Sequence, residues 1–203
     1  VLLALAVVYT TPWDNLLISY GVWRYGDGVT AGTIFAAPLG EYLFFVFQPA
    51  LVALWLYNLD IPTDGSLRLS ARSRLVGLAA GLAVSALGIG LLIAGPSTLY
   101  LGAILAWGGP ILAIQWAFGW PVLWERRRTF ALGVGVPTAY LAAVDRIAIE
   151  LGIWTFDPAY MTGLAILGLP IEELLFFGLT NVFLVQGLLL FWWVTDRWEQ
   201  VRT

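Results

Sequence analysis

Two adjacent carboxylic acids, Glu172 and Glu173, stand in the segment GLPIEELLFF, part of an apolar stretch that continues to Val194. An ionised carboxylate at mid-membrane costs roughly 2.5–3.5 kcal/mol on insertion scales, so acids in apolar helices usually face the protein interior and serve a function. No Arg lies close to this pair in the sequence. We therefore interpret both glutamates as candidate catalytic groups.

The motif around these acids occurs twice, because residues 13–45 resemble residues 144–177. Both segments read D-x6-G-x-W and further along P-x-x-E-x-x-F-F. The spacing between these two parts is one residue longer in the second segment. The duplicated residues are Asp14, Gly21, Trp23, Pro38, Glu41, Phe44 and Phe45 in one copy, and Asp145, Gly152, Trp154, Pro170, Glu173, Phe176 and Phe177 in the other. The repeat thus adds three candidate catalytic acids, namely Asp14, Glu41 and Asp145.

Carboxyl groups of this kind can carry acid–base chemistry. Burial in an apolar site favours the protonated form, which is a general acid and becomes a base once it has donated its proton. If Pro38 and Pro170 occupy the first turns of their helices, the helix N-termini favour the anion instead. Structural roles compete, since helix termination at Asp14 or pairing of Asp145 with Arg146 explains these residues as well as catalysis does.

Aromatic side chains accompany the acids. Four of them follow a glutamate by three to five residues, about one helical turn: Phe44, Phe45, Phe176 and Phe177. Beside carboxylic acids, such rings could stabilise a carbocation and exclude the water that would quench it. Trp23, Trp154 and Tyr42 could act in the same way, although membrane-interface anchoring explains them more simply, as packing explains any single Phe.

The composition predicts an integral membrane protein. Of the 203 residues, 60% are hydrophobic and only 11% are charged, whereas a soluble domain is about half apolar and a quarter charged. The chain has no Cys and no His, which excludes thiolate nucleophiles and His-ligated metals, and all ten basic residues are Arg, which excludes a lysine Schiff base. We predict neither a metal nor a cofactor. No basic stripe indicates nucleic acid as a partner.

The predicted fold is all-α, with about six transmembrane helices in a single membrane domain. The spans lie at about 1–20, 33–57, 73–95, 97–118, 129–149 and 164–194, and we interpret the first as truncated. The chain divides into repeat halves at about 1–95 and 97–203. Spans one and two resemble spans five and six, and the matching spans cross the membrane in the same direction. Spans three and four would form a helical hairpin. Glu41 and Glu173 would lie about 10 Å inside their helices.

The distribution of Arg predicts the orientation of these spans. Loops on one side contain only Arg24 and Arg146. Loops on the other side contain Arg68, Arg72, Arg74, Arg126, Arg127, Arg128, Arg197 and Arg202. Because positive charge gathers in cytoplasmic loops, both termini should be cytoplasmic in a multi-pass protein of the cell membrane. The connections at 13–32 and 150–163 should then face outward.

The doubled motif reads PLGEYLFF at 38–45 and PIEELLFF at 170–177, and D-x6-G-x-W precedes each copy. This pattern resembles the lycopene cyclase domain family. These are integral-membrane carotenoid cyclases of haloarchaea, other bacteria and fungi, whose two homologous halves are separate or fused; this chain resembles the fused form over nearly its whole length. The resemblance implies proton-initiated, non-redox cyclisation of the acyclic ends of lycopene to β-ionone rings. It implies a membrane-dissolved lycopene substrate and no cofactor.

One departure from the family pattern leaves alternatives open. The family motif is usually P-x-E-E, and Gly40 replaces the first glutamate in the first copy. A non-catalytic partner subunit is therefore one alternative, and a C50 carotenoid cyclase with the same acids is another. From a different class, a proton-coupled transporter could also use parallel repeats and intramembrane acids. A homo-oligomer is a further prediction.

Overall fold

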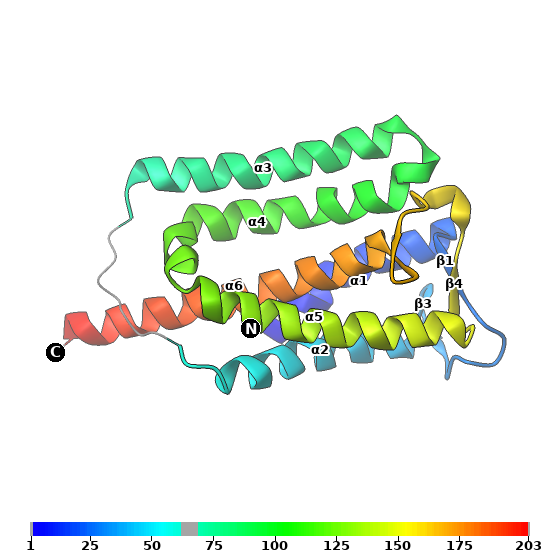
Figure 1. Cartoon of the computed structure of the whole chain (residues 1–203), viewed down its shortest axis with the longest axis horizontal. Helices are drawn as coiled ribbons and strands as arrows, with labels where there is room; N and C mark the ends of the chain where they lie inside the picture. The colour runs from blue at the N-terminus through cyan, green and yellow to red at the C-terminus, as the bar shows by residue number, and fades with distance from the viewer. Residues whose placement is uncertain (1, 62–68, 203) are drawn as a thin grey trace.

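A computed structural model describes residues 2–61 and 69–202 (Figure 1). The main helices are α1 (Leu2–Tyr20), α2 (Leu39–Tyr57), α3 (Ala71–Ala94), α4 (Leu99–Glu125), α5 (Arg127–Glu150) and α6 (Ile171–Arg202). Short 3-10 helices are η1 (Pro96–Thr98) and η2 (Pro158–Tyr160). The strands are β1 (Trp23–Tyr25), β2 (Thr33–Ile34), β3 (Ala37–Pro38), β4 (Trp154–Phe156), β5 (Ala165–Ile166) and β6 (Leu169–Pro170).

The all-α membrane fold is confirmed, with one qualification about the first helix. Five described helices, α2 to α6, are long and apolar enough to cross a membrane. α1 has a comparable length, but it contains polar residues such as Thr10, Thr11, Asp14 and Asn15, which lower its hydropathy. The sidedness of the helices stays a prediction, and Arg68, one of the residues on which it rests, lies outside the described residues.

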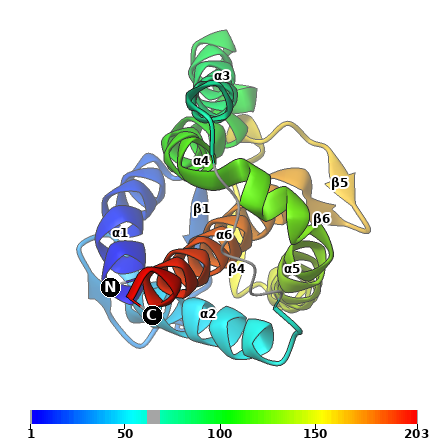
Figure 2. The same cartoon turned by 90° about the vertical axis from the view of Figure 1, so that its left-hand side faces the viewer.

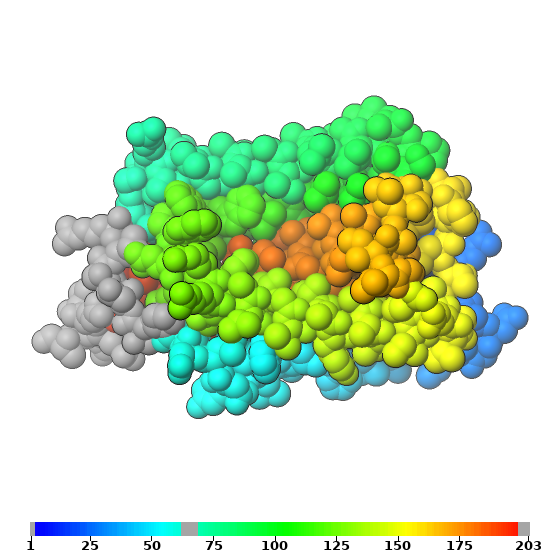
Figure 3. Space-filling model, in the orientation of Figure 1, coloured from blue at the N-terminus to red at the C-terminus, as the bar shows by residue number. Residues whose placement is uncertain are grey.

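α6 forms the centre of the bundle. It lies among α1, α2, α4 and α5, while α3 packs on the outer side of α4 (Figure 2). On the face seen in Figure 3, α6 is visible only as a strip between α4 and α5. α1 and α5 run toward the end of the molecule that carries β1 and β4, and α2 and α6 run away from it (Figure 1). The side chains that line a site at that end therefore come from several helices.

The predicted hairpin of spans three and four is confirmed as α3 and α4, which are joined through η1. Glycines allow the two helices to approach closely: a Cβ added at Gly81 would lie 2.2 Å from the backbone nitrogen of Ala113. α4 is longer than predicted and ends at Glu125. It bends at Gly119, whose backbone is not helical, because Pro121 supplies no N–H to the helix ladder and its ring crowds the preceding turn.

Both motif copies fold in the same local way. Each begins with a helix and a three-residue strand, and β1 pairs with β4 in antiparallel register, Trp23 opposite Phe156. Each continues with a two-stranded hairpin, β2–β3 or β5–β6, that passes through one non-glycine residue with positive φ, Phe35 or Leu167. These observations support the repeat, although its parallel symmetry stays a prediction.

The hairpins correct the predicted depth of the motif glutamates. Residues 33–38 and 165–170 were included in the predicted helices, but they form the hairpins, and the helices begin only at Leu39 and Ile171. Glu41 and Glu173 therefore lie in the first helical turns, about 3 Å along the axis rather than about 10 Å. Hydropathy could not reveal this boundary, because the hairpin residues are nearly as apolar as the helix. Pro38 and Pro170 precede the helices instead of occupying their first turns.

A buried polar network joins α2, α5 and α6 in the middle of the bundle. The Gln48 amide donates to Thr180 Oγ1 at 2.8 Å and to Asn181 Oδ1 at 3.0 Å, and Asn181 donates to Thr138 Oγ1 at 2.9 Å. Without water, a buried amide is stable only when it finds such partners. The network fixes the register of the helices that line the site.

The close approach of α3 and α4 leads to a stability prediction. Gly81→Ala should destabilise the folded protein by about 1–3 kcal/mol, because the new methyl group would overlap the backbone of α4. Gly90→Ala is the matched control, since a Cβ at Gly90 would meet nothing within 4 Å. Thermal unfolding of the detergent-solubilised proteins would measure both. Equal stability of the two variants would contradict the proposed packing.

Candidate active site

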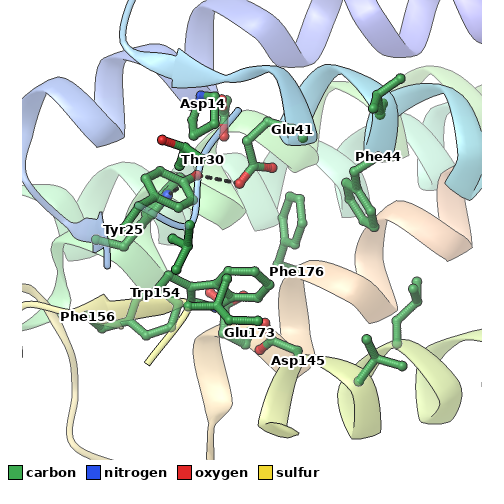
Figure 4. Close-up of a pocket in the computed structure, with 18 of the residues that line it drawn as sticks. Asp14, Tyr25, Thr30, Glu41, Phe44, Asp145, Trp154, Phe156, Glu173 and Phe176 are labelled. Carbon is green, nitrogen blue, oxygen red and sulfur yellow. Dashed lines mark hydrogen bonds between the residues drawn. The ribbon is translucent and has the colours of Figure 1, made fainter. Parts of the chain in front are cut away.

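A cavity of about 420 Å³ lies at the end of the bundle that carries β1 and β4 (Figure 4). Its walls come from α1, α2, α5 and α6, with contributions from β1, β4 and the first residues of α4. Most of the lining residues are apolar, and the polar groups among them are chiefly carboxyl and hydroxyl groups. The volume is in the range typical of sites for small organic ligands.

Four of the five predicted acids meet in this cavity. Figure 4 shows Asp14 beside Glu41 on one side and Asp145 beside Glu173 on the other. Asp14 and Asp145 are each 3% exposed, and Glu173 is 5% exposed. The repeat thus supplies one aspartate–glutamate pair from each copy, although the copies lie 131 positions apart in the sequence.

No positive charge offsets these acids, because the described residues that line the cavity include no Arg. Arg146 instead pairs with Glu150 and donates to the Leu167 carbonyl, so it does not neutralise its neighbour Asp145. Two carboxylates in one apolar site repel each other, which favours a proton held within each pair. In the described part of the chain, no group of three or more acidic residues is placed to hold a metal ion.

Each cavity glutamate accepts a short hydrogen bond from a tyrosine. Tyr25 donates to Glu41 Oε1 at 2.5 Å, and Tyr100 donates to Glu173 Oε1 at 2.6 Å. Trp23 in turn donates its indole N–H to the Tyr25 hydroxyl at 3.0 Å. Burial, and then the charge of Glu41, raise the pKa of Tyr25, so its hydroxyl keeps its proton and remains a donor. These bonds hold one oxygen of each glutamate and leave the other available.

Aromatic rings line the cavity around the two acid pairs. Phe44 and Phe176 line the cavity between them (Figure 4). Trp13 stacks on Phe176 with ring centroids 5.6 Å apart, and Phe177 meets both Phe44 and Phe176 edge-on. Trp23 and Trp154 also line the cavity. The electron-rich ring faces provide a surface that can attract a cation.

Glu172 lies elsewhere. Its side chain is fully buried and does not line the cavity; its Oε1 accepts hydrogen bonds from the backbone N–H and the hydroxyl of Thr162, at 2.8 and 2.6 Å. Adjacent helical residues point about 100° apart, so only Glu173 can reach the cavity. Glu172 thereby ties the segment before β5 to the start of α6.

Two predicted aromatic residues also lie outside the cavity lining. Phe45 is buried beside Phe44, and Tyr42 donates its hydroxyl hydrogen to the Ile34 carbonyl at 2.8 Å. Tyr42 also accepts a hydrogen bond from Asn15, which holds the β2–β3 hairpin through the N–H groups of residues 36 and 37. These contacts support the hairpin rather than the acids.

The sequence prediction missed Tyr25, Tyr100, Trp13 and Phe156, all of which line the cavity. Tyr25 lies two residues beyond the duplicated Trp23, but the matching position of the second copy is Phe156 and not a tyrosine. Tyr100 begins α4, which belongs to neither motif copy. The repeat cannot identify residues that are not duplicated, and neither tyrosine stands beside the motif acids in the sequence.

The chain is similar to known proteins over nearly its whole length. It is 49% identical over 199 residues to the lycopene beta-cyclase of Halobacterium salinarum, across 98% of this chain and 84% of that protein. It is 37% identical over 206 residues to the bifunctional lycopene cyclase/phytoene synthase of Leptosphaeria maculans, across 94% of this chain but 35% of that longer protein. No family model and no solved structure matches. The extent and identity of the first match show that the chain belongs to the lycopene beta-cyclase family.

Proposed function

We propose that this protein is a lycopene beta-cyclase that closes the acyclic end groups of lycopene by acid–base catalysis alone. The main support is the arrangement of the site, in which two aspartate–glutamate pairs face each other across an aromatic cavity with no basic residue among its described lining. The similarity to the Halobacterium protein supports the same activity. Such a reaction belongs to the isomerase or intramolecular lyase type.

The reaction balances without an external reagent. A carboxyl group adds a proton to the terminal double bond of the substrate and leaves a tertiary carbocation. An internal double bond supplies the electron pair for the new ring carbon–carbon bond, which moves the positive charge into the ring. A carboxylate then removes a ring proton and restores a double bond. Because the product is an isomer of the substrate, no redox cofactor is required.

We assign the proton donation to Glu173. It is nearly buried, whereas Glu41 is partly exposed, so water competes least with the substrate for the proton of Glu173. Asp145 lies beside it and can share that proton, and Tyr100 holds one carboxyl oxygen in place. Phe176 and its neighbours stabilise the cation, while Glu41 and Asp14 on the opposite side offer a base.

The bilayer is the proposed location of the protein and the source of its lipophilic substrate. Described arginines such as Arg72, Arg74 and Arg126 lie at helix ends remote from β1 and β4. With these ends in the cytoplasm, the cavity lies near the outer face of the membrane. The gathering of the cavity acids at one end supports a cyclase over a transporter, which would need a relay across the membrane.

The first prediction concerns Glu173. In a bacterial host that accumulates lycopene, the chain should yield cyclised carotenes, detectable by chromatography and absorption. Glu173→Gln should lower the conversion by about 10²–10⁴-fold, because the amide cannot donate an acidic proton. Glu125→Gln, an exposed site at the other end of α4, should convert lycopene as the parent does. Unchanged lycopene with the parent protein present in the membrane would refute the proposed function.

A second prediction separates Glu172 from Glu173. Glu172→Gln keeps a carbonyl oxygen that can accept both hydrogen bonds from Thr162, so it should retain most of the activity. Glu172→Leu removes this acceptor and should lower both activity and thermal stability. If Glu172→Gln were as inactive as Glu173→Gln while remaining folded, Glu172 would have to take part in proton transfer.

A third prediction concerns the tyrosine that positions Glu173. Tyr100→Phe removes one hydrogen bond to a charged or partly charged group, worth about 1.5–3 kcal/mol, and should lower kcat by about tenfold or more. KM for lycopene should change little, because the ring remains in place. Tyr9→Phe is the control, since Tyr9 donates only to the Trp107 carbonyl. An unchanged kcat for Tyr100→Phe would show that Glu173 does not depend on this bond.

A further inference from the structure

The two motif copies differ in the contact between the helix start and the segment before the hairpin. In the second copy, Glu172 bonds to Thr162 and joins the start of α6 to the segment before β5. The residues 132 positions earlier are Gly40 and Thr30, and this contact cannot form because Gly40 has no side chain. A Cβ at Gly40 would meet nothing within 4 Å, although Gly40 lines the cavity. The cavity wall is therefore open at the start of α2.

Apolar side chains form the rim of this opening. Side chains of α2, of α5 and of the loop before β2 line the cavity and are 42%, 46%, 45% and 46% exposed: Leu39, Leu43, Val144 and Val29. Side chains that line a cavity and are also this exposed mark its mouth. Both helices are apolar enough to cross a membrane, so an apolar rim at this place suits contact with lipid.

α2 and α5 are held together at their other ends. The Trp55 indole donates to the Leu132 carbonyl at 3.0 Å, and the Thr129 hydroxyl donates to the carbonyl of Asp60, just beyond α2, at 2.9 Å. At the cavity end, the rim residues of the two helices have space between them that belongs to the cavity. Helices α2 and α5 are thus in contact at one end and separated at the end that carries the acids.

Two neighbouring regions are less suited to a hydrocarbon. Between α1 and α4 the wall is sealed by Trp13 stacked on Trp107, with ring centroids 4.8 Å apart. A separate hollow outside β1 is lined by polar groups that include Ser19, Arg24 and Asp27. An apolar chain would have to displace water from these groups, which costs free energy.

We propose that the acyclic end of the polyene enters the cavity sideways from the bilayer, through the mouth between the start of α2 and the end of α5. This inference rests on the proposed function. A cavity of about 420 Å³ takes one end group, and the remainder of the chain extends through the mouth into lipid. The substrate never has to leave the bilayer, and its end arrives between the two acid pairs.

The chain contains no Cys, so single cysteines can be labelled without background. Leu43→Cys and Val144→Cys would place a thiol on each side of the mouth. Phe47→Cys on α2 and Ile147→Cys on α5 are matched controls, because these residues are 64% and 55% exposed and do not line the cavity. Each purified variant would be treated with a bulky aromatic maleimide or with a small methylthiolating reagent, and lycopene conversion would be measured in lipid–detergent micelles.

The bulky label should lower conversion at least tenfold at both mouth positions, and the small reagent should lower it much less. Added lycopene should slow labelling at the mouth but not at the control positions. Full conversion by both maleimide-labelled mouth variants would overturn the proposed entrance. If the unlabelled parent converted no lycopene, the proposed function itself would fail, so the two failures are distinguishable.

Discussion

The cavity of this protein depends on keeping four carboxyl groups in an apolar space that has no basic residue in its described lining. Ion pairing would satisfy them most simply, but it would also remove the proton that an acid catalyst must donate. The structure uses neutral partners instead: Tyr25 and Tyr100 donate to the glutamates, and each aspartate lies beside a glutamate. Neutral hydrogen bonds orient a carboxyl group without fixing it as an anion.

The hairpins before α2 and α6 matter because they decide where the glutamates lie along their helices. By delaying the helix start to Leu39 and Ile171, they place Glu41 and Glu173 in first turns, where free backbone N–H groups favour negative charge. This location stabilises the carboxylate that remains after proton donation. Burial favours the protonated carboxyl group, and the helix N-terminus favours the carboxylate. Both influences suit a group that must exist in both states during catalysis.

The two copies of the motif differ at one position of the helix start. In one copy, Glu172 binds Thr162; in the other, Gly40 has no side chain and leaves space in the cavity lining. The same backbone, a hairpin leading into a helix, accommodates both because the difference concerns only side chains. Gly40 corresponds to Glu172 and not to Glu173, so the lack of a side chain at position 40 leaves the cavity acids intact.

Hydropathy and duplication are local patterns, so the membrane class, the helical hairpin of α3 and α4, and the candidate acids can be predicted from the sequence alone. Which of the two adjacent glutamates enters the cavity depends on the folded structure, since a rotation of 100° about α6 separates Glu172 from Glu173. The folded structure also added Tyr100, which α4 brings to Glu173 across 73 positions of sequence. Such a contact depends on how helices pack, and in an almost uniformly apolar chain no periodicity shows which faces pack together.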